Sequence, residues 1–324
     1  MTDDAFAQLV AADLARIEGA LRRTAVADSP FVTEAARHVI DAGGKRFRPL
    51  LVVLAARLAQ GAGPLTEQAR VDNAALVVEL THVASLYHDD VMDEARMRRG
   101  VEAANLRYGN TVSILVGDYL FSRASSIVAT LGVDFVARQA ATFAELVQGQ
   151  VAETRGAPEG ADPMVHYLGV LHGKTASLIA TSAVFGGMVA GLPAAQVDTL
   201  DAFGSHLGMA FQLHDDLMDI VSDASGKTPG TDLRAGVATL PVLLLTRTGE
   251  ASDDALFARI RAGLSADEVD EVVATLRGHP VIGLARAAVL DEVGQARALL
   301  DDLPAGPARD TLDQVCGTLV DRLD

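Results

Sequence analysis

The chain has 324 residues, of which 49% are hydrophobic and 22% charged, a balance that excludes a disordered protein and permits a large core. The formal net charge of −16 argues against a general affinity for nucleic acid, which requires a basic face, and against electrostatic docking on an anionic membrane. Cys316 is the only cysteine, so an intrachain disulfide and a cysteine-based zinc site are both excluded.

The first predicted element is an amphipathic helix over residues 6–21, in which apolar side chains recur at three- and four-residue steps. The charge of this N-terminal segment is acidic first and basic later, which is the reverse of a signal peptide. The chain contains no apolar run of the roughly 18–20 residues that cross a membrane. These features predict a cytoplasmic protein without a transmembrane segment.

Helix start and stop signals divide the rest of the chain. Ser29 and Pro30 predict an N-cap and a first helical residue, and this second helix is expected to end at Gly43–Gly44. Pro49 is expected to open a third helix, and a long helix is predicted over residues 69–95. Further breaks are predicted at Gly100, Gly109, 131–134, 156–163, 191–193, 224–232, 279–283 and 303–307.

The patterns favour helices throughout, because no segment alternates between apolar and polar residues as a half-buried strand does. The expected fold is therefore all-α, with about a dozen helices packed in one domain over residues 1–324. A division into two domains near residues 156–163 is the alternative.

Two acidic segments with the pattern DDxxD and largely apolar flanks carry the strongest chemical signal. Their carboxylates are Asp89, Asp90 and Asp93 in LYHDDVMD (86–93), and Asp215, Asp216 and Asp219 in QLHDDLMD (212–219). Two acid clusters on core-like helices require a cation between them, because like charges repel and unpaired buried carboxylates are costly. Oxygen ligands favour Mg²⁺ over zinc, and Mg²⁺ completes its shell with water and substrate phosphates. The segments therefore predict facing helices that hold a diphosphate or triphosphate, whereas one such motif alone is more typical of a solvated acidic face.

Basic residues cluster around the first acidic segment. They are Lys45, Arg46 and Arg48 in GGKRFRP (43–49), and Arg98 and Arg99 in RRG (98–100). Lysine and arginine bind phosphate as a point charge and as a bidentate donor, so the clusters indicate a phosphate site. For either cluster alone, charges that complement a helix dipole are the alternative. GKT (173–175) lacks the upstream glycine of a P-loop. His88 and His214 point away from the aspartate stripes, which favours a packing role.

Taken together, these segments resemble the trans-isoprenyl diphosphate synthases, and most closely the long-chain polyprenyl diphosphate synthases of actinobacteria. The resemblance covers about residues 43–241 and depends on the order and spacing of several motifs. They are GGKRFRPLL, HVASLYHDDVMDEARMRRG, GDYLF, GKTASLI and FQLHDDLMD, followed by GKTPGTDL and TLP. The resemblance implies an all-helical bundle in which the two aspartate motifs face a central cavity, usually in a homodimer.

The family resemblance also implies roles for individual residues. The six motif aspartates would bind Mg²⁺, with three ions in each active site, and Asp89, Asp215 and Lys174 would be catalytic. Isopentenyl diphosphate would contact Gly44, Lys45, Arg48, His82 and Arg99, and the allylic diphosphate would contact Arg98, Lys174, Thr175, Gln212 and Lys227. One departure is Val237, which replaces a lysine that the family often has before TLP, so diphosphate binding is expected to depend more on the other cations.

Product length is expected to depend on Ala84 and Ser85, which lie where bulky residues close the tunnel in short-chain members of the family. Both are small, and one helical turn of about 5.4 Å is close to one isoprene unit, so a product of about 30 to 50 carbons is expected. Such a product suggests a quinone side-chain precursor. Geranylgeranyl diphosphate synthase, a non-catalytic subunit of a heteromeric synthase and a class I terpene cyclase are the alternatives. At most, peripheral membrane contact is expected for product release.

Overall fold

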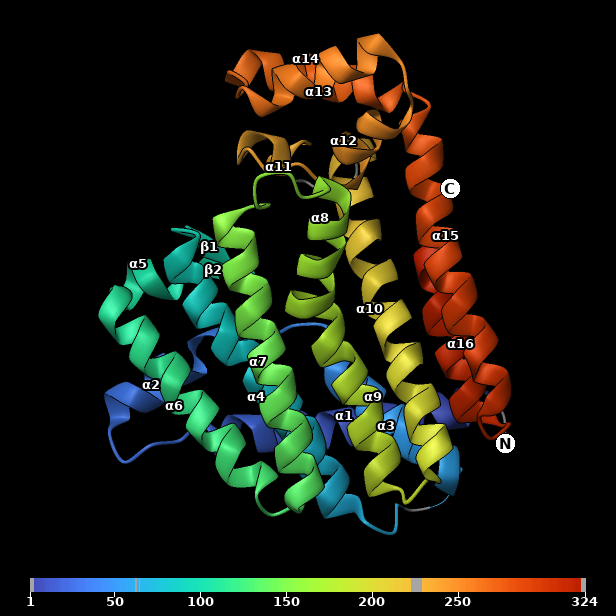
Figure 1. The fold of residues 1–324 in the computed structure, drawn as a ribbon. Coiled ribbons are helices and arrows are strands. Elements are labelled where there is room, and N and C mark those ends of the chain that lie inside the picture. Colours follow the sequence, from blue (N-terminus) through green and yellow to red (C-terminus); the bar gives the residue numbers. More distant parts are fainter. Residues whose placement is uncertain (1–2, 62, 64, 223–228, 322–324) are drawn as a thin grey trace. The chain divides into compact units, whose positions relative to one another are not determined.

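The computed structural model describes residues 3–61, 63, 65–222 and 229–321, which form helices and one small hairpin. The first half contains α1 (Asp3–Thr24), α2 (Pro30–Asp41), α3 (Phe47–Gln60), α4 (Gln68–Met92), β1 (Met97–Arg98), β2 (Val101–Glu102), α5 (Ala104–Tyr108), α6 (Asn110–Val128) and α7 (Val133–Arg155). The second half contains α8 (Pro163–Leu171), the π-helical turn η1 (His172–Ala176), α9 (Ser177–Val189), α10 (Ala194–Val221), α11 (Thr231–Arg234), α12 (Leu240–Leu244), η2 (Leu245–Arg247), α13 (Ala251–Arg261), α14 (Ala266–Arg277), α15 (Val281–Leu299), η3 (Leu300–Asp302) and α16 (Pro307–Val320). The predicted all-α fold is confirmed (Figure 1).

Local signals explain most of the helix boundaries. Ser29 is the N-cap of α2, where its side chain accepts a hydrogen bond from the Val32 N–H, and Pro30 is the first helical residue as predicted. The helix ends at Asp41, just before Gly43. The third helix begins two residues before Pro49, because proline is tolerated within the first turn, where its missing N–H has no helical partner.

The hairpin β1–β2 is the element that the sequence patterns did not predict. Arg98 pairs with Val101, so only Arg99 and Gly100 form the turn. Both have positive φ angles, 52° and 81°, as a two-residue type I′ turn requires. Two-residue strands are too short for alternation to reveal, and an arginine at the first turn position is an uncommon signal.

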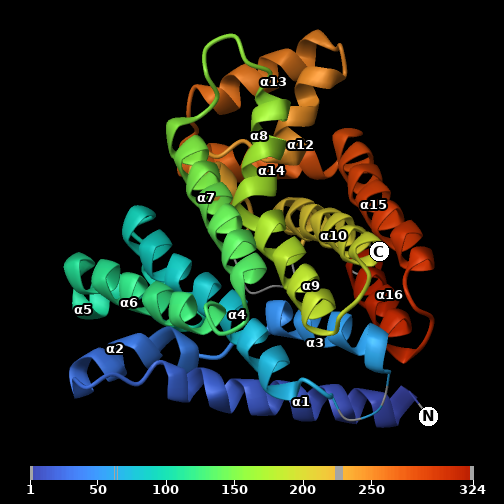
Figure 2. The same ribbon diagram turned by 60° about the horizontal axis from the view of Figure 1, so that its bottom comes forward.

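The chain divides into two compact units, which are described separately. The first comprises Met1–Phe143, Leu178–Gly204 and Leu300–Leu312. Its central element is α4, which is buried on several faces and contacts α1, α3, α5 and α6. Figure 2 shows α1 running alongside α2 and α3. The first aspartate motif therefore stands at the end of a core helix, which limits how its side chains are oriented.

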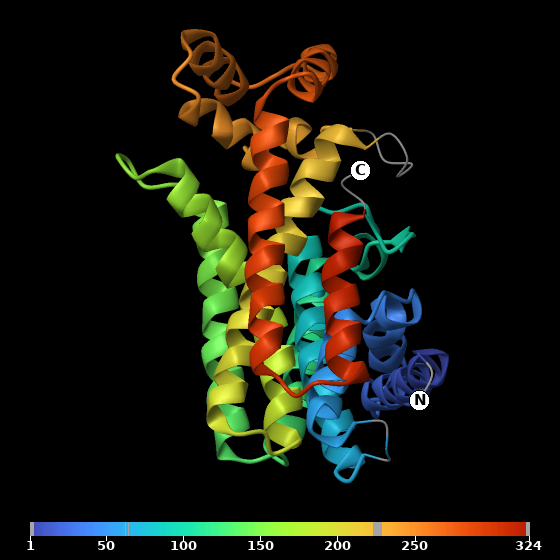
Figure 3. The same ribbon diagram turned by 90° about the vertical axis from the view of Figure 1, so that its right-hand side faces the viewer.

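The second unit comprises Ala144–Ser177, Ser205–Leu299 and Asp313–Asp324. Within it, α12 contacts α15, and both helices contribute buried apolar side chains such as Val242, Leu243 and Val289. Figure 3 shows α13 and α14, in orange, at the N-terminal end of the long α15. The second aspartate motif lies in the last turns of α10.

Contrary to the expectation that no apolar run is long enough, one stretch of the described residues, Pro163–Val189, is long and apolar enough to cross a membrane. It comprises α8, η1 and α9, and 72% of the relevant window is buried inside the protein. Burial of this kind is typical of a core helix, whose apolar surface is already covered by protein.

Replacing Gly186 by alanine is expected to destabilise the first unit. A Cβ at this position would lie 2.3 Å from the Val52 carbonyl oxygen and 2.7 Å from Ala55 Cβ, so α9 would have to move away from α3. Overpacking of this kind lowers the free energy of unfolding by about 1–3 kcal/mol. Chemical denaturation of Gly186→Ala measures the loss.

Gly294→Ala provides the matched control. Gly294 is exposed within α15, and no heavy atom lies within 4 Å of an added Cβ. Alanine should stabilise this helix by about 0.5–1 kcal/mol. A Gly186→Ala protein as stable as the wild type would contradict the close packing of α9 on α3.

Candidate active site

The first aspartate motif ends α4 and combines buried and exposed carboxylates. Asp90 is fully buried, and its Oδ1 accepts a hydrogen bond of 2.7 Å from Arg98 Nε and forms an ion pair of 2.7 Å with Arg98 Nη2. Its Oδ2 is buried and has no hydrogen-bond partner among the described residues. Asp89 is half-buried and Asp93 is exposed at the C-cap of the helix. The three acids therefore differ in role: Asp90 orients Arg98, whereas Asp93 is open to solvent.

The predicted isopentenyl diphosphate residues of the first unit lie on four segments. Gly44 and Lys45 are exposed in the loop before α3, Arg48 lies in the first turn of α3, and His82 lies in α4. Arg99 lies in the hairpin turn, and an added Cβ at Gly44 would approach its Cζ to 2.9 Å. A side chain at position 44 would therefore displace the Arg99 guanidinium, and the φ angle of 150° at this position also favours glycine.

Charges within this cluster affect one another. Burial lowers the pKa of the Arg48 guanidinium to about 10, with Glu79 opposing this shift and Arg99 adding to it. Burial, followed by the positive charges of Arg48 and Arg99, holds the pKa of His82 well below its ordinary value. His82 is therefore neutral at neutral pH. Arg48 Nε is buried without a hydrogen-bond partner among the described residues, as expected of a cation that awaits an anionic ligand.

The second aspartate motif, in the second unit, is held by neutral donors. Asp216 is buried, and its two oxygens accept hydrogen bonds from the Tyr167 hydroxyl and, at 3.0 Å, from Gln212 Nε2. Asp219 accepts hydrogen bonds of 3.1 Å from the backbone N–H groups of Thr231 and Asp232, at the start of α11. These bonds fix both carboxylates and leave their charge unneutralised.

The environment of Asp216 favours its protonated form. Burial raises the pKa of Asp216 to about 6, the charges of Asp215 and Asp219 add to the shift, and the hydrogen bonds from Tyr167 and Gln212 oppose it. Asp215 is the most accessible of the three, with 56% of its side chain exposed. A cation at this motif would relieve the repulsion among the three carboxylates.

The predicted residues Lys174 and Thr175 lie in the π-helical turn η1, a feature that is frequent at functional sites. Lys174 Nζ forms an ion pair with Glu153 of α7. An added Cβ at Gly149 would lie 2.7 Å from the Lys174 backbone nitrogen, so the two backbones approach closely. Thr175 Oγ1 donates a hydrogen bond of 3.3 Å to Gln212 Oε1. The structure thus joins Thr175, Gln212 and Asp216 in one chain of hydrogen bonds.

Four further residues were singled out in the sequence, and the structure describes three of them: Val237, His88 and His214. Lys227 lies outside the described residues. Val237, in the place of a lysine, is exposed. His88 Nε2 lies 3.1 Å from the Ile114 carbonyl oxygen and contacts Gly117 of α6, which agrees with a packing role. His214 is buried, and its Nδ1 lies 3.6 Å from Asp215 Oδ1.

The two predicted chain-length residues differ in accessibility. Ala84 is fully buried, and its carbonyl oxygen lies at the close approach of α4 to Gly117 of α6. Ser85 is half-buried, and its hydroxyl donates a hydrogen bond of 2.9 Å to the His82 carbonyl oxygen. Ser85 is therefore the more accessible of the pair.

Sequence reasoning missed three residues that support the candidate site: Glu79, Tyr167 and Glu153. Glu79 is a buried acid within the apolar run of α4, and a charge in such a run is a signal that a partner is required. Tyr167 and Glu153 carry no comparable signal, because their partners are distant in the sequence.

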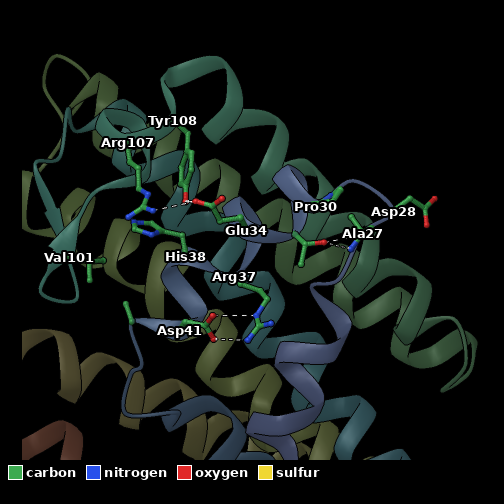
Figure 4. Close-up of a pocket in the computed structure, with 12 residues that line it drawn as sticks. Ala27, Asp28, Pro30, Glu34, Arg37, His38, Asp41, Val101, Arg107 and Tyr108 are labelled. Carbon is green, nitrogen blue, oxygen red and sulfur yellow. Dashed lines mark hydrogen bonds and ion pairs between the residues drawn. The ribbon is translucent and has the colours of Figure 1, made fainter.

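An open groove of about 800 Å³ lies beside α2 and α5 in the first unit, and none of the predicted site residues lines it (Figure 4). Four of its charged side chains pair with one another. Arg107 lies 3.3 Å from Glu34, which also accepts a hydrogen bond from Tyr108, and Arg37 lies 3.2 Å from Asp41. Arg37 Nε, like Arg48 Nε, is buried without a hydrogen-bond partner among the described residues, but Arg37 differs from Arg48 in having this acidic partner.

Comparison with known proteins gives consistent matches over nearly the whole chain. The family described as polyprenyl synthetase matches residues 29–276. A nonaprenyl diphosphate synthase of Mycobacterium tuberculosis is 43% identical over 327 residues, covering 99% of this chain and 95% of the relative. A decaprenyl diphosphate synthase from Rhodobacter capsulatus superposes with a TM-score of 0.89 and 34% identity, covering 100% of both chains.

A further solved structure was determined with ligands. It is a geranylgeranyl pyrophosphate synthase from Corynebacterium glutamicum complexed with calcium and isoprenyl diphosphate. It has a TM-score of 0.85 and 39% identity, and the match covers 98% of this chain and 97% of that one.

In the metal-free protein, Tyr167→Phe is expected to be more destabilising at about pH 8 than at about pH 5. The native pKa of Asp216, about 6, lies above its ordinary 3.8, so the stability that this group contributes is present below 3.8 and lost as the pH rises through 6. The Tyr167 hydroxyl favours the ionised carboxylate, and a hydrogen bond to a charged group is worth about 1.5–3 kcal/mol. Chemical denaturation at the two pH values measures the difference.

Tyr119→Phe is the control for this experiment, because the Tyr119 hydroxyl donates to a neutral acceptor, the Val26 carbonyl oxygen, at 2.8 Å. Its loss should have the same effect at both pH values. An equally pH-independent effect of Tyr167→Phe would show that the Asp216 carboxylate does not depend on Tyr167.

Proposed function

Because the chain belongs to the polyprenyl synthetase family and is a prenyltransferase, we propose that it condenses isopentenyl diphosphate head-to-tail with an allylic diphosphate. Geranyl, farnesyl and geranylgeranyl diphosphate are the candidate primers. The product is a long-chain all-trans polyprenyl diphosphate of about 30 to 50 carbons, which suits a quinone side chain. The observation that carries this proposal is the pair of intact DDxxD motifs together with a cluster of cations that includes the unpartnered Arg48.

The residues present suit Mg²⁺ as the cofactor. The donors are hard carboxylate oxygens, and the buried Oδ2 of Asp90 lacks a partner among the described residues. Within those residues, no group of three or more His, Cys, Asp or Glu side chains could hold a metal ion alone. Mg²⁺ normally binds one or two carboxylates plus substrate phosphates, so this arrangement fits. The ligands would come from Asp89, Asp90, Asp93, Asp215, Asp216 and Asp219, and three ions per site are proposed.

Each part of the chain has a distinct task in the proposed reaction. When bound, Mg²⁺ supplies charge that stabilises the departing diphosphate. Arg98, Lys174 and Lys227 add positive charge there, with Thr175 and Gln212 as polar contacts. Lys45, Arg48, His82 and Arg99 hold isopentenyl diphosphate so that its double bond meets the allylic carbon. Apolar walls exclude water from the cationic intermediate, and the released diphosphate accepts the final proton.

We propose that the active protein is a homodimer. Large apolar side chains are exposed on α6 and α7, among them Ile114, Leu115 and Val136, and these side chains are the candidates for the interface. The two compact units are proposed to form one domain, and the enzyme is proposed to be cytoplasmic, with at most peripheral membrane contact for product release.

Alternative functions explain less of the sequence. A terpene cyclase needs no second diphosphate site, yet this chain has the complete GGKRFRP segment. A non-catalytic subunit of a heteromeric synthase would not need all six motif aspartates, and none is lost here. A geranylgeranyl diphosphate synthase would stop at a shorter product, which small residues at positions 84 and 85 do not favour.

The direct test is incorporation of labelled isopentenyl diphosphate into each allylic primer in the presence of Mg²⁺. Asp215→Asn should lower kcat by roughly 100-fold, about 2.7 kcal/mol, because the accessible carboxylate of the second motif loses its charge. Asp198→Asn, an exposed acid on the same helix, is the control and should leave kcat unchanged. No incorporation by the wild type with any primer would refute the proposed function.

Chain length gives a second test. Ser85→Phe should shorten the product, because a bulky ring replaces an accessible hydroxyl one turn before Asp89. Ala84→Phe enlarges a fully buried side chain and should lower the free energy of unfolding by about 1–3 kcal/mol as well. Chromatography of the products and thermal melts separate the two effects. An unchanged product from Ser85→Phe would exclude Ser85 from the tunnel wall.

A further inference from the structure

Glu79 is a buried acid that has no role in the mechanism described above. It lies in α4, only 2% exposed, with the buried Val78 and Leu80 on either side. A carboxylate in such a place requires a cation, because an unpaired buried charge is far more costly than a paired one. Its partners therefore indicate why the protein retains it.

Two arginines from different loops meet Glu79. Arg46 Nη1 lies 2.8 Å from Glu79 Oε1, and Arg99 Nη2 lies 3.9 Å from the same oxygen. Both arginines have left-handed backbone conformations, with φ angles of 48° and 52°, which cost about 1 kcal/mol or more for a residue with a side chain. One carboxylate thus ties together two strained segments, the loop before α3 and the turn of the hairpin.

The remaining donors of these arginines are also directed at protein groups. Arg46 donates hydrogen bonds to Glu18 at 2.6 and 3.1 Å and to the Ile40 carbonyl oxygen at 2.8 Å. Arg99 Nη1 donates to the carbonyl oxygens of Val39 and Gly43. Arg46 is therefore a fixed structural cation, whereas Arg48, two residues later, has no ion pair or hydrogen bond with the described residues.

We propose that Glu79 is a positioning residue for the diphosphate of isopentenyl diphosphate, acting through Arg99. This inference rests on the proposed function. Electrostatic repulsion alone would predict the opposite effect, because a carboxylate near an anion site repels the anionic ligand. The proposal therefore requires that orientation of the cations outweighs this repulsion.

Glu79→Gln tests the proposal, with Glu18→Gln as the matched control. Both changes remove a carboxylate from Arg46, but only Glu79 pairs with Arg99. Glu79→Gln should raise the KM for isopentenyl diphosphate about tenfold, equivalent to about 1.4 kcal/mol. The KM for the allylic primer should change less than about twofold. Glu18→Gln should change neither KM by more than about twofold. Thermal melts establish that each variant is folded.

Three results would overturn the positioning role. The first is an equal change of both KM values in Glu79→Gln, and the second is the same rise of the KM for isopentenyl diphosphate in Glu18→Gln. The third is a lower KM for isopentenyl diphosphate in Glu79→Gln, which would mean that Glu79 only repels the ligand. If Glu79→Gln does not fold, Glu79→Asp keeps the charge but shortens its reach, and it should raise the same KM severalfold. An unchanged KM in that variant would also overturn the role.

Calorimetric titration with isopentenyl diphosphate in the absence of Mg²⁺ separates this inference from the proposed function. Wild-type protein that binds the ligand but incorporates none would refute the synthase activity alone. Weaker binding by Glu79→Gln than by Glu18→Gln would still support the positioning role. Equal binding by the two variants would refute it.

Discussion

The need to pair the buried carboxylates of α4 shapes the first half of the candidate site. Glu79 and Asp90 are eleven residues apart, which places them about 20° apart around the helix and about 16 Å apart along it. Arg99 pairs with Glu79 and Arg98 pairs with Asp90. The two arginines are adjacent in the hairpin, so their side chains extend in different directions from it. The strained turn at Arg99 is tolerated because it delivers one arginine to each carboxylate. The helix and the hairpin thus depend on each other for their charge balance.

In the second motif, uncharged hydrogen-bond donors hold the carboxylates in place of cations. Among the described residues, Asp216 and Asp219 are held by a phenol, an amide and two backbone N–H groups, none of which carries a charge. These donors orient the carboxylates but do not cancel their repulsion, and the pKa of Asp216 rises accordingly. In the first motif, Arg98 compensates Asp90. The two motifs look alike in sequence but differ in how strongly they require an added cation.

The sequence predicts those features that depend on local or repeated patterns. The stripe of α1, the Ser29 cap and the length of α4 follow from periodicity and capping. The clustered aspartates of the two DDxxD segments are enough to predict a site for a metal ion and a diphosphate. The hairpin escapes prediction because its strands have two residues each. Tyr167 and Asp216 are 49 residues apart, and no local rule pairs a tyrosine with a distant acid. Such contacts are decided by helix packing, which a single sequence does not display.

The protein donors to the motif carboxylates bear on how metal and diphosphate would bind under the proposed function. Protein donors occupy both oxygens of Asp216 and of Asp219, and Arg98 occupies one oxygen of Asp90. Under the proposed function, Mg²⁺ would complete its shell with substrate phosphates, because it usually takes only one or two protein carboxylates. Binding of metal and of diphosphate then strengthen each other by the same factor, because such coupling is reciprocal. Under the proposed function, an allylic substrate without its diphosphate would bind without this gain, which would favour substrates that carry the leaving group the reaction requires.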